Sequence, residues 1–197
     1  MLAPAFPDPP RATQAVFRQL MEAMARPGQV RSLALELAAP APLGAAAAAL
    51  ALTLLDYETP FWLDPPLAAA PELREWFKFH TGAPLTADCA EAVFAFVADP
   101  ARCPPFDAFA QGSLEYPDRS TTLVLQVDGF DRGERLELAG PGIAGTRRLC
   151  AAPLPGDFHA RVAANRALFP RGIDLVLASR DALAALPRST RVRSGDG

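Results

Sequence analysis

The stretch "GSLEYPDRSTTLVLQV", residues 112–127, joins a polar, proline-broken turn to a run typical of a buried β-strand. Residues 120–127 carry no charge and are rich in Thr, Val and Leu, which suits a strand in a covered sheet. Residues 115–120 just before it are Glu-Tyr-Pro-Asp-Arg-Ser. This hexapeptide is either only the turn that feeds the strand or a set of polar groups aimed at a ligand.

Helical and strand patterns alternate along the chain on both sides of this stretch. Apolar residues recur at helical spacing in residues 13–25, 71–80 and 158–168, and the alanine-rich run 45–55 predicts a buried helix. Residues 181–186 predict one more short helix. Strands are predicted at residues 29–37, 93–98, 120–127, 135–140, 173–179 and 189–193, and residues 56–64 predict a turn and a short strand.

This alternation predicts a three-layer α/β/α domain, with a sheet covered on both faces. Residues 128–133, "DGFDRG", suit a hairpin loop between two strands, which would make the sheet mixed. With 197 residues the chain is long enough for one core. We expect a Pro-rich arm at residues 1–12, a single domain at 13–190 and a flexible tail at 191–197.

Charge and hydropathy exclude two classes of partner. The net charge is -3 and no cluster of Lys or Arg stands out, which argues against nucleic-acid binding. The apolar run 37–55 is interrupted by Pro40, Pro42 and Gly44, so a membrane span is not expected. The first ten residues lack the basic and apolar regions of a secretory signal, which predicts a cytoplasmic protein.

Metal and cofactor signals are weak. Cys89, Cys103 and Cys150 form no CxxC pair and there are only two histidines, so no metal site is expected. Residues 140–145, "GPGIAG", satisfy G-x-G-x-x-G, but the following residues predict no helix to bind a pyrophosphate. Lys78 could form a Schiff base, although a snorkelling lysine at a helix end explains it as well. We expect no cofactor.

Two groups of polar residues are candidates for a site. Glu115, Arg119 and Ser120 crowd into the turn before a strand, and loops at strand ends often carry function. A Glu-Arg pair that stabilises the turn is the alternative. Arg26, next to a Pro-Gly pair at a helix end, is either an anion-binding group or a helix cap.

Three further polar residues call for an explanation. His80 and Thr81 end a helix and enter a turn, where the imidazole either faces a cleft or caps the helix. Asp174 lies within an apolar strand, so its carboxylate must be paired, hydrogen-bonded or at a sheet edge. No Ser-centred elbow, Walker loop or HExxH motif is present.

Six segments, in order, resemble the H-subunit family of the bacterial carbon-phosphorus lyase system, and the resemblance runs from about residue 13 to 190. They are "FRQLMEAMARPGQV", "LTLLDYETPFWL", "FHTGAPL", "FAQGSLEYPDRSTTLVLQV", "LELAGPGI" and "FPRGIDLVLA". The resemblance implies a fold like the large domain of pyridoxal-phosphate-dependent transferases, without the cofactor. It also implies G, I and J partner subunits and support for transfer of a ribosyl triphosphate from ATP to an alkylphosphonate.

The resemblance assigns no catalytic residue to this subunit, so two functions remain open. The first is an assembly subunit, not catalytic alone, whose apolar surface docks on partners and which forms a homodimer by itself. The second is a cytosolic enzyme or participant that binds a phosphonate or ATP. The ligand or partner candidates are Arg26, His80, Thr81, Glu115, Arg119 and Ser120.

Overall fold

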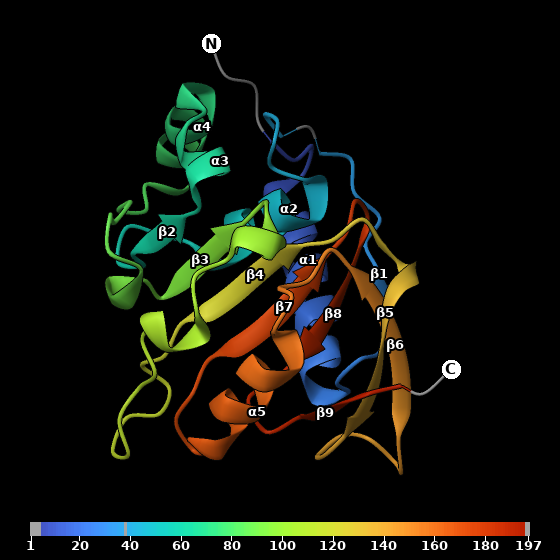
Figure 1. Cartoon of the computed structure of the whole chain (residues 1–197). Coiled ribbons are helices and arrows are strands. Elements are labelled where there is room, and N and C mark those ends of the chain that lie inside the picture. The colour runs from blue at the N-terminus through green and yellow to red at the C-terminus, as the bar shows by residue number, and fades with distance from the viewer. Residues whose placement is uncertain (1–4, 38, 196–197) are drawn as a thin grey trace.

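The computed structural model describes residues 5–37 and 39–195, and a six-stranded sheet runs through its centre (Figure 1). The strand order is β1-β8-β7-β4-β3-β2, with β2, β3, β4 and β7 parallel to one another. Strand β8 is antiparallel to both β7 and β1. The strands are β1 (Arg31–Ser32), β2 (Phe61–Leu63), β3 (Phe94–Val97), β4 (Thr122–Gln126), β7 (Asp174–Ala178) and β8 (Ala182–Leu186).

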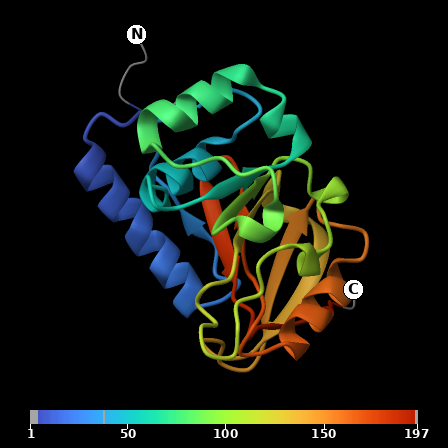
Figure 2. The same cartoon turned by 90° about the vertical axis from the view of Figure 1, so that its left-hand side faces the viewer.

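Each face of this sheet is covered by its own hydrophobic cluster. Alternate side chains of one strand go to opposite faces, so Val124 packs on one side while Leu123 and Leu125 pack on the other. Figure 2 shows α1 on one side of the sheet and α5 on the other. The helices are α1 (Pro9–Ala25), α2 (Ala45–Leu54), α3 (Pro65–Ala68), α4 (Pro71–Thr81) and α5 (Phe158–Ala167), with 3-10 turns η1 (Cys89–Glu91), η2 (Pro100–Arg102) and η3 (Phe106–Ala108).

The layer that contains α5 also contains a second, three-stranded antiparallel sheet. Its order is β6-β5-β9, formed by β5 (Gly129–Ala139), β6 (Arg147–Ala152) and β9 (Arg191–Ser194). The chain is therefore α/β with a mixed central sheet, as predicted, but the third layer is only partly helical.

The helices on the other face follow from local sequence. The Asp8 carboxylate accepts a hydrogen bond from the Arg11 N–H at 3.4 Å, and Pro9 stands at the first helical position, where a missing N–H costs nothing. Helix α1 therefore begins four residues before the predicted start. Helix α2 is buried along most of its length, as its alanine-rich sequence predicts.

Residues 181–186 do not form the predicted helix. Ala182–Leu186 is strand β8, which pairs with β7 and β1 and is buried along its whole length. Periodicity cannot distinguish a buried helix from a buried strand in so short an apolar run. Here the segment is a strand because it pairs with β7 and β1 on its two sides.

The predicted hairpin after β4 is also wrong. Strand β5 pairs with β6 and β9 and leaves the central sheet, which is mixed because of β8 and β1. Residues 140–145 form the turn between β5 and β6, and no helix follows them. In the stretch 29–37 only Arg31–Ser32 is paired as a strand.

The domain limits expected at residues 13 and 190 do not coincide with element ends, since α1 begins at Pro9 and β9 ends at Ser194. Residues 1–4 of the expected arm and 196–197 of the expected tail lie outside the described residues. Among the helices of the described residues, none is long and apolar enough to cross a membrane.

Candidate functional site

Arg188, between β8 and β9, forms a nearly buried ion pair with Asp174 at the start of β7. Nε donates to Oδ1 at 3.1 Å, Nη2 donates to Oδ2 at 2.6 Å, and the Arg188 backbone N–H donates to Oδ1 at 2.8 Å. The side chains are only 14% and 16% exposed. Two parallel charge-assisted bonds fix the orientation of the guanidinium. The expectation that Asp174 needs a partner is confirmed.

The same guanidinium joins two loops. Nη1 donates to the carbonyl of Pro117 at 2.6 Å and to that of Pro170 at 3.4 Å, while Nη2 donates to Ser120 Oγ at 2.6 Å. Pro117 and Ser120 belong to the hexapeptide, and Pro170 follows α5. Arg188 therefore holds loops 112–119 and 169–172 against each other.

Loop 112–119 is itself a tight, hydrogen-bonded turn. Ser113 Oγ accepts from the Tyr116 N–H at 2.9 Å, and the Tyr116 carbonyl accepts from the N–H groups of Ser113 and Arg119 at 3.1 and 3.2 Å. Gly112 has φ of 69°, and a Cβ there would lie 2.8 Å from the Pro117 carbonyl oxygen. Only glycine fits this position without strain.

The second loop is held from beneath by Asn165 of α5. This buried amide accepts from the Ile173 N–H at 2.8 Å and donates to the Ile173 carbonyl at 2.9 Å. The Gly172 N–H donates to the Gln111 carbonyl at 2.9 Å, which connects the loop directly to the residue before loop 112–119. Both loops are thus fixed to the core and to each other.

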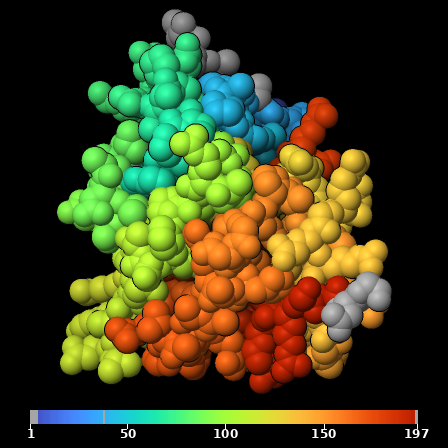
Figure 3. All heavy atoms as spheres, in the orientation of Figure 1, coloured from blue at the N-terminus to red at the C-terminus, as the bar shows by residue number. Residues whose placement is uncertain are grey.

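Large apolar side chains project outward from these fixed loops. Leu114 is 74% exposed, Phe169 61% and Tyr116 49%, and the Arg119 guanidinium lies 4.2 Å from the Tyr116 ring centroid. We call Leu114, Tyr116, Arg119 and Phe169 the Arg188-pinned surface. Figure 3 shows the yellow-green loop protruding at the lower left, next to orange segments from the C-terminal part of the chain.

Glu115 and Arg119 do not form the ion pair that was the alternative explanation of the turn. Arg119 stacks on Tyr116, and the ion pairs found among the described residues do not include one between Glu115 and Arg119. Ser120 is buried and its hydroxyl accepts a hydrogen bond from Arg188, so it supports the loop from inside and is not part of the exposed surface. Glu115 is exposed at the turn.

The other predicted residues lie elsewhere. Arg26 is the residue after α1, where it pairs with Glu22 at 3.2 Å, and its carbonyl accepts from Arg147 Nη1 at 3.1 Å. Thr81 ends α4, and its hydroxyl donates to the Phe77 carbonyl at 2.8 Å. The candidates therefore occupy three separate places.

His80 lies among aromatic side chains at the end of α4. Its ring centroid is 4.9 Å from those of Trp76 and Phe79, and burial lowers the pKa of the imidazole. With Phe6 and Leu52 it lines a cavity of about 340 Å³. A neutral imidazole in such surroundings suits packing or contact with an apolar ligand.

The Arg188-pinned surface lies at the amino ends of β4 and β7, which are paired in parallel with Thr122 opposite Asp174. Ligands of open α/β sheets bind outside the carboxyl ends of the strands. A pocket of about 240 Å³ does lie there, lined among others by Gln126, Ser179 and Arg180. The position of the hexapeptide therefore favours a partner surface over a small-molecule site.

A buried carboxylate shapes the same carboxyl edge. Asp64 follows β2, is 2% exposed and accepts hydrogen bonds from the N–H groups of Leu67, Ala98 and Asp99 at 3.2, 2.8 and 2.9 Å. Burial raises its pKa, and the three donors oppose that effect. Asp64 thus fixes the end of β2 to the end of β3.

In the described part of the chain, no group of three His, Cys, Asp or Glu side chains could hold a metal ion. Burial raises the pKa of Cys103 to about 12, which keeps this thiol protonated and unreactive.

Comparison with known proteins adds the family. The model of the family "Bacterial phosphonate metabolism protein (PhnH)" matches residues 4–193. The chain belongs to the PhnH family. It is 50% identical over 188 residues to "Alpha-D-ribose 1-methylphosphonate 5-triphosphate synthase subunit PhnH" of Rhizobium meliloti (strain 1021), covering 95% of this chain and 94% of that protein.

A second relative points to the same system. The "Putative C-P lyase subunit protein HtxG" of Stutzerimonas stutzeri is 42% identical over 82 residues, which is 41% of this chain and 42% of that protein. The resemblance inferred from the six motifs is confirmed. The chain is a PhnH subunit of the carbon-phosphorus lyase pathway of phosphonate metabolism. Neither comparison assigns a catalytic residue.

The sequence analysis did not identify Arg188, whose guanidinium holds the two loops of the surface together. It stands alone in "LPRST", 14 residues from Asp174, 68 from Ser120 and 71 from Pro117. The signal that could have found it was Asp174, whose need for a cation was evident, although several arginines could have met that need.

Proposed function

We propose that this chain is an assembly subunit of the complex that transfers a ribosyl triphosphate from ATP to an alkylphosphonate, and is not its catalyst. Its partners in this proposal are the G, I and J subunits of the carbon-phosphorus lyase system, and alone it forms a homodimer. The fold in this proposal is related to the large domain of pyridoxal-phosphate-dependent transferases. The relative's name, a triphosphate synthase subunit, supports this role.

The observation that carries the proposal is the rigidity of the Arg188-pinned surface. Tyr and Arg are enriched among residues that dominate binding energy, and a surface already fixed in the free protein loses little entropy on docking. Arg188 supplies that fixation through Asp174, Pro117 and Pro170. Exposed Leu114 and Phe169 supply apolar area.

The test is native mass spectrometry of the chain co-expressed with the G, I and J subunits of its own genome. We expect the double variant Leu114→Ser, Tyr116→Ala to raise the Kd for the partner subunits about tenfold, equivalent to 1.4 kcal/mol of binding, and so to lower the fraction of heteromeric complex. Its thermal stability should stay within about 0.5 kcal/mol of the parent, because both side chains are exposed. Tyr57→Ala, at a residue 75% exposed in the loop between α2 and β2, is the matched control.

If the double variant formed as much complex as the parent, the Arg188-pinned surface would not be the docking surface. Growth of a strain lacking this subunit on methylphosphonate as phosphorus source gives an independent readout. Complementation should follow complex formation, because the chain acts in this proposal through its partners.

The second candidate function is direct binding of a small anion at the carboxyl edge. The pocket of about 240 Å³ is lined by the exposed Arg180 and the buried Ser179, and also by Asp128, whose carboxylate would oppose anion binding. A phosphonate fits this volume, whereas drug-sized ligands use pockets of roughly 300–1,000 Å³. Methylphosphonate would then raise the melting temperature of the isolated chain, and Arg180→Ala would abolish the shift while Arg26→Ala would keep it.

A further inference from the structure

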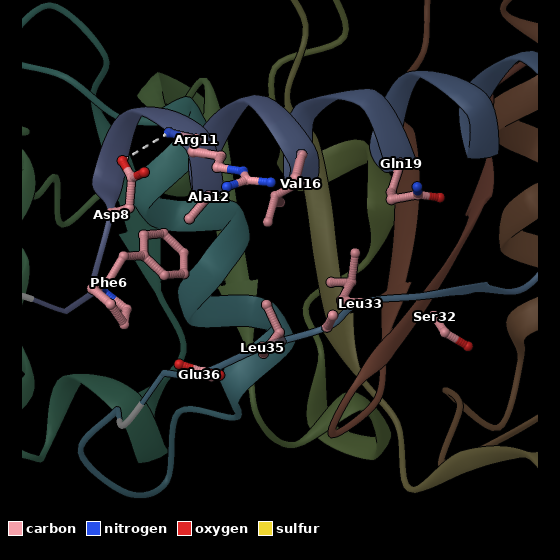
Figure 4. Close-up of a pocket in the computed structure, with 13 residues that line it drawn as sticks. Phe6, Asp8, Arg11, Ala12, Val16, Gln19, Ser32, Leu33, Leu35 and Glu36 are labelled. Atoms are coloured by element: carbon pink, nitrogen blue, oxygen red, sulfur yellow. Dashed lines mark hydrogen bonds between the residues drawn. The ribbon is translucent and has the colours of Figure 1, made fainter.

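The cavity of about 340 Å³ beside His80 is lined by residues from the start of α1, from α2 and from the end of α4. Phe6 is one of its walls and also lines a larger groove of about 780 Å³ between α1 and segment 32–36 (Figure 4). In the figure the Phe6 side chain lies below the first turn of α1. Phe6 therefore borders two separate cavities, of which the smaller has the more uniform lining.

Two phenylalanines from different elements line the smaller cavity. Phe6 precedes α1 and is 4% exposed, whereas Phe79 of α4 is 59% exposed. A ligand that covered the Phe79 ring would remove apolar area from water, which favours binding. Aromatic side chains are the platforms on which planar rings stack. The cavity thus favours a flat aromatic ligand over an aliphatic one.

His80 supplies a polar contact at this cavity. Its ring centroid lies 4.9 Å from those of Trp76 and Phe79, and burial lowers the pKa of the imidazole, so the ring is neutral at about pH 7.5. A neutral imidazole has one N–H donor and one nitrogen acceptor. The side-chain hydrogen bonds found among the described residues include none with this imidazole. A ligand therefore meets no competing partner for it within that part of the chain.

The other polar side chain of the lining is Thr13, and its proton is already used. The hydroxyl donates to the carbonyls of Pro9 and Pro10 at 2.9 and 3.2 Å, so Oγ is only an acceptor toward a ligand. None of the described residues that line the cavity is an acid, a lysine or an arginine. A phosphate or carboxylate would lose hydration there without gaining a partner. The ligand is therefore uncharged and has donor and acceptor atoms at its edge.

The size of the cavity limits the ligand further. Drug-sized ligands occupy pockets of roughly 300–1,000 Å³, so a cavity of about 340 Å³ admits a ring system without a long substituent. We propose that this cavity binds a free purine base, stacked on Phe79 and hydrogen-bonded to His80. Adenine has ring nitrogens that accept and an exocyclic amine that donates, which matches the imidazole and Thr13 Oγ. Its fused rings also offer more stacking area than a single ring.

This site is separate from those of the proposed functions. None of its lining residues belongs to the Arg188-pinned surface or to the pocket at the carboxyl edge. Base binding can therefore fail while assembly and anion binding stand, and the reverse also holds.

The test is isothermal titration calorimetry of the full chain with adenine at about pH 7.5, where the imidazole is neutral. ATP should compete with adenine at least about tenfold more weakly, because no cation lines the cavity to bind its phosphates. Indole has a similar shape but no ring acceptor, so it should bind about fivefold more weakly than adenine. Competition by ATP as strong as that of adenine itself, or indole binding as tight as that of adenine, overturns the proposal.

Variants of the lining locate the site. Phe79→Ala should weaken adenine binding about tenfold, through loss of stacking, and should keep the fold because the ring is exposed. His80→Phe keeps an aromatic ring but loses the donor and acceptor, and should weaken binding about fivefold. Phe17→Ala, at a phenylalanine of α1 that is 47% exposed and does not line the cavity, is the matched control and should bind as the parent does. A parent that does not bind adenine, or equal binding by the parent, Phe79→Ala and His80→Phe, overturns the proposal.

Discussion

Arg188 and Asp174 meet through two parallel hydrogen bonds, Nε to Oδ1 at 3.1 Å and Nη2 to Oδ2 at 2.6 Å. The pair contacts the two loops that carry the exposed Leu114 and Phe169, and its own side chains are only 14% and 16% exposed. Because the same guanidinium bonds the carbonyls of Pro117 and Pro170, the buried ion pair determines where the exposed side chains stand. Stability and surface shape are thus linked through one residue.

Removing one partner of this pair should cost more than removing both. Arg188→Gln leaves the Asp174 carboxylate buried without its cation, and we expect a loss of about 3 kcal/mol in the free energy of unfolding. The double variant Arg188→Gln, Asp174→Asn should recover part of that loss, because no uncompensated charge remains. Urea unfolding of both single variants and the double variant measures the coupling. Additive losses would mean that the pair carries no interaction energy.

The turn of loop 112–119 gives a second prediction through its glycine. Gly112 and Gly145 both have positive φ, 69° and 76°, but a Cβ at Gly112 would lie 2.8 Å from the Pro117 carbonyl oxygen, while one at Gly145 meets nothing within 4 Å. Gly145→Ala should therefore cost only the backbone strain, about 1 kcal/mol. Gly112→Ala should cost clearly more and also weaken partner binding. Equal losses in urea unfolding would show that the close contact relaxes freely.

The sequence predicted the elements whose periodicity is unambiguous. Helix α4 has its buried residues Leu73, Trp76 and Phe77 at helical spacing and ends at Gly82 in the left-handed conformation, and α2 is recognisable from its alanines. Strand β8 could not be predicted, because five apolar residues without a period fit a helix as well as a strand. The segment 29–37 alternates between apolar and polar residues, as a strand does. Whether its backbone pairs depends on which strand lies beside it, and the tertiary fold rather than the local sequence determines that.

The exposed position of the hexapeptide follows from the sequence for a physical reason, whereas its role as a site stays a prediction. The hexapeptide was singled out because charged residues before an apolar strand need an explanation, and the structure places it on an exposed, fixed loop. Its joining to loop 169–172 was not foreseen, since contacts across 68 to 71 residues are set by strand order rather than by local pattern. The sequence also could not tell that the loop lies at the amino ends of the parallel strands.

The buried Asp64 gives a prediction about the opposite edge of the sheet. In Asp64→Asn one carboxylate oxygen becomes an NH₂ group, which would face the N–H groups of Ala98 and Asp99 or of Leu67. A donor facing donors in a buried place should cost about 2 kcal/mol. Asp99→Asn is the control, since it keeps the backbone N–H that bonds Asp64 and removes only a carboxylate whose charge raises the pKa of Asp64. Similar stability of the two variants in urea would mean that water replaces the missing acceptor.

The last prediction concerns pH and His80. Burial lowers the pKa of this imidazole from 6.5, so the unfolded chain binds its proton more readily than the folded chain does. Stability should therefore fall as pH decreases through about 6.5 and the unfolded state gains protons. His80→Gln removes this contribution and should show a smaller loss of melting temperature between about pH 7.5 and pH 5.5. Because the ring is partly exposed, the difference should be modest. If the parent and His80→Gln lost the same melting temperature over this range, the Trp76 and Phe79 surroundings would not perturb the imidazole in solution.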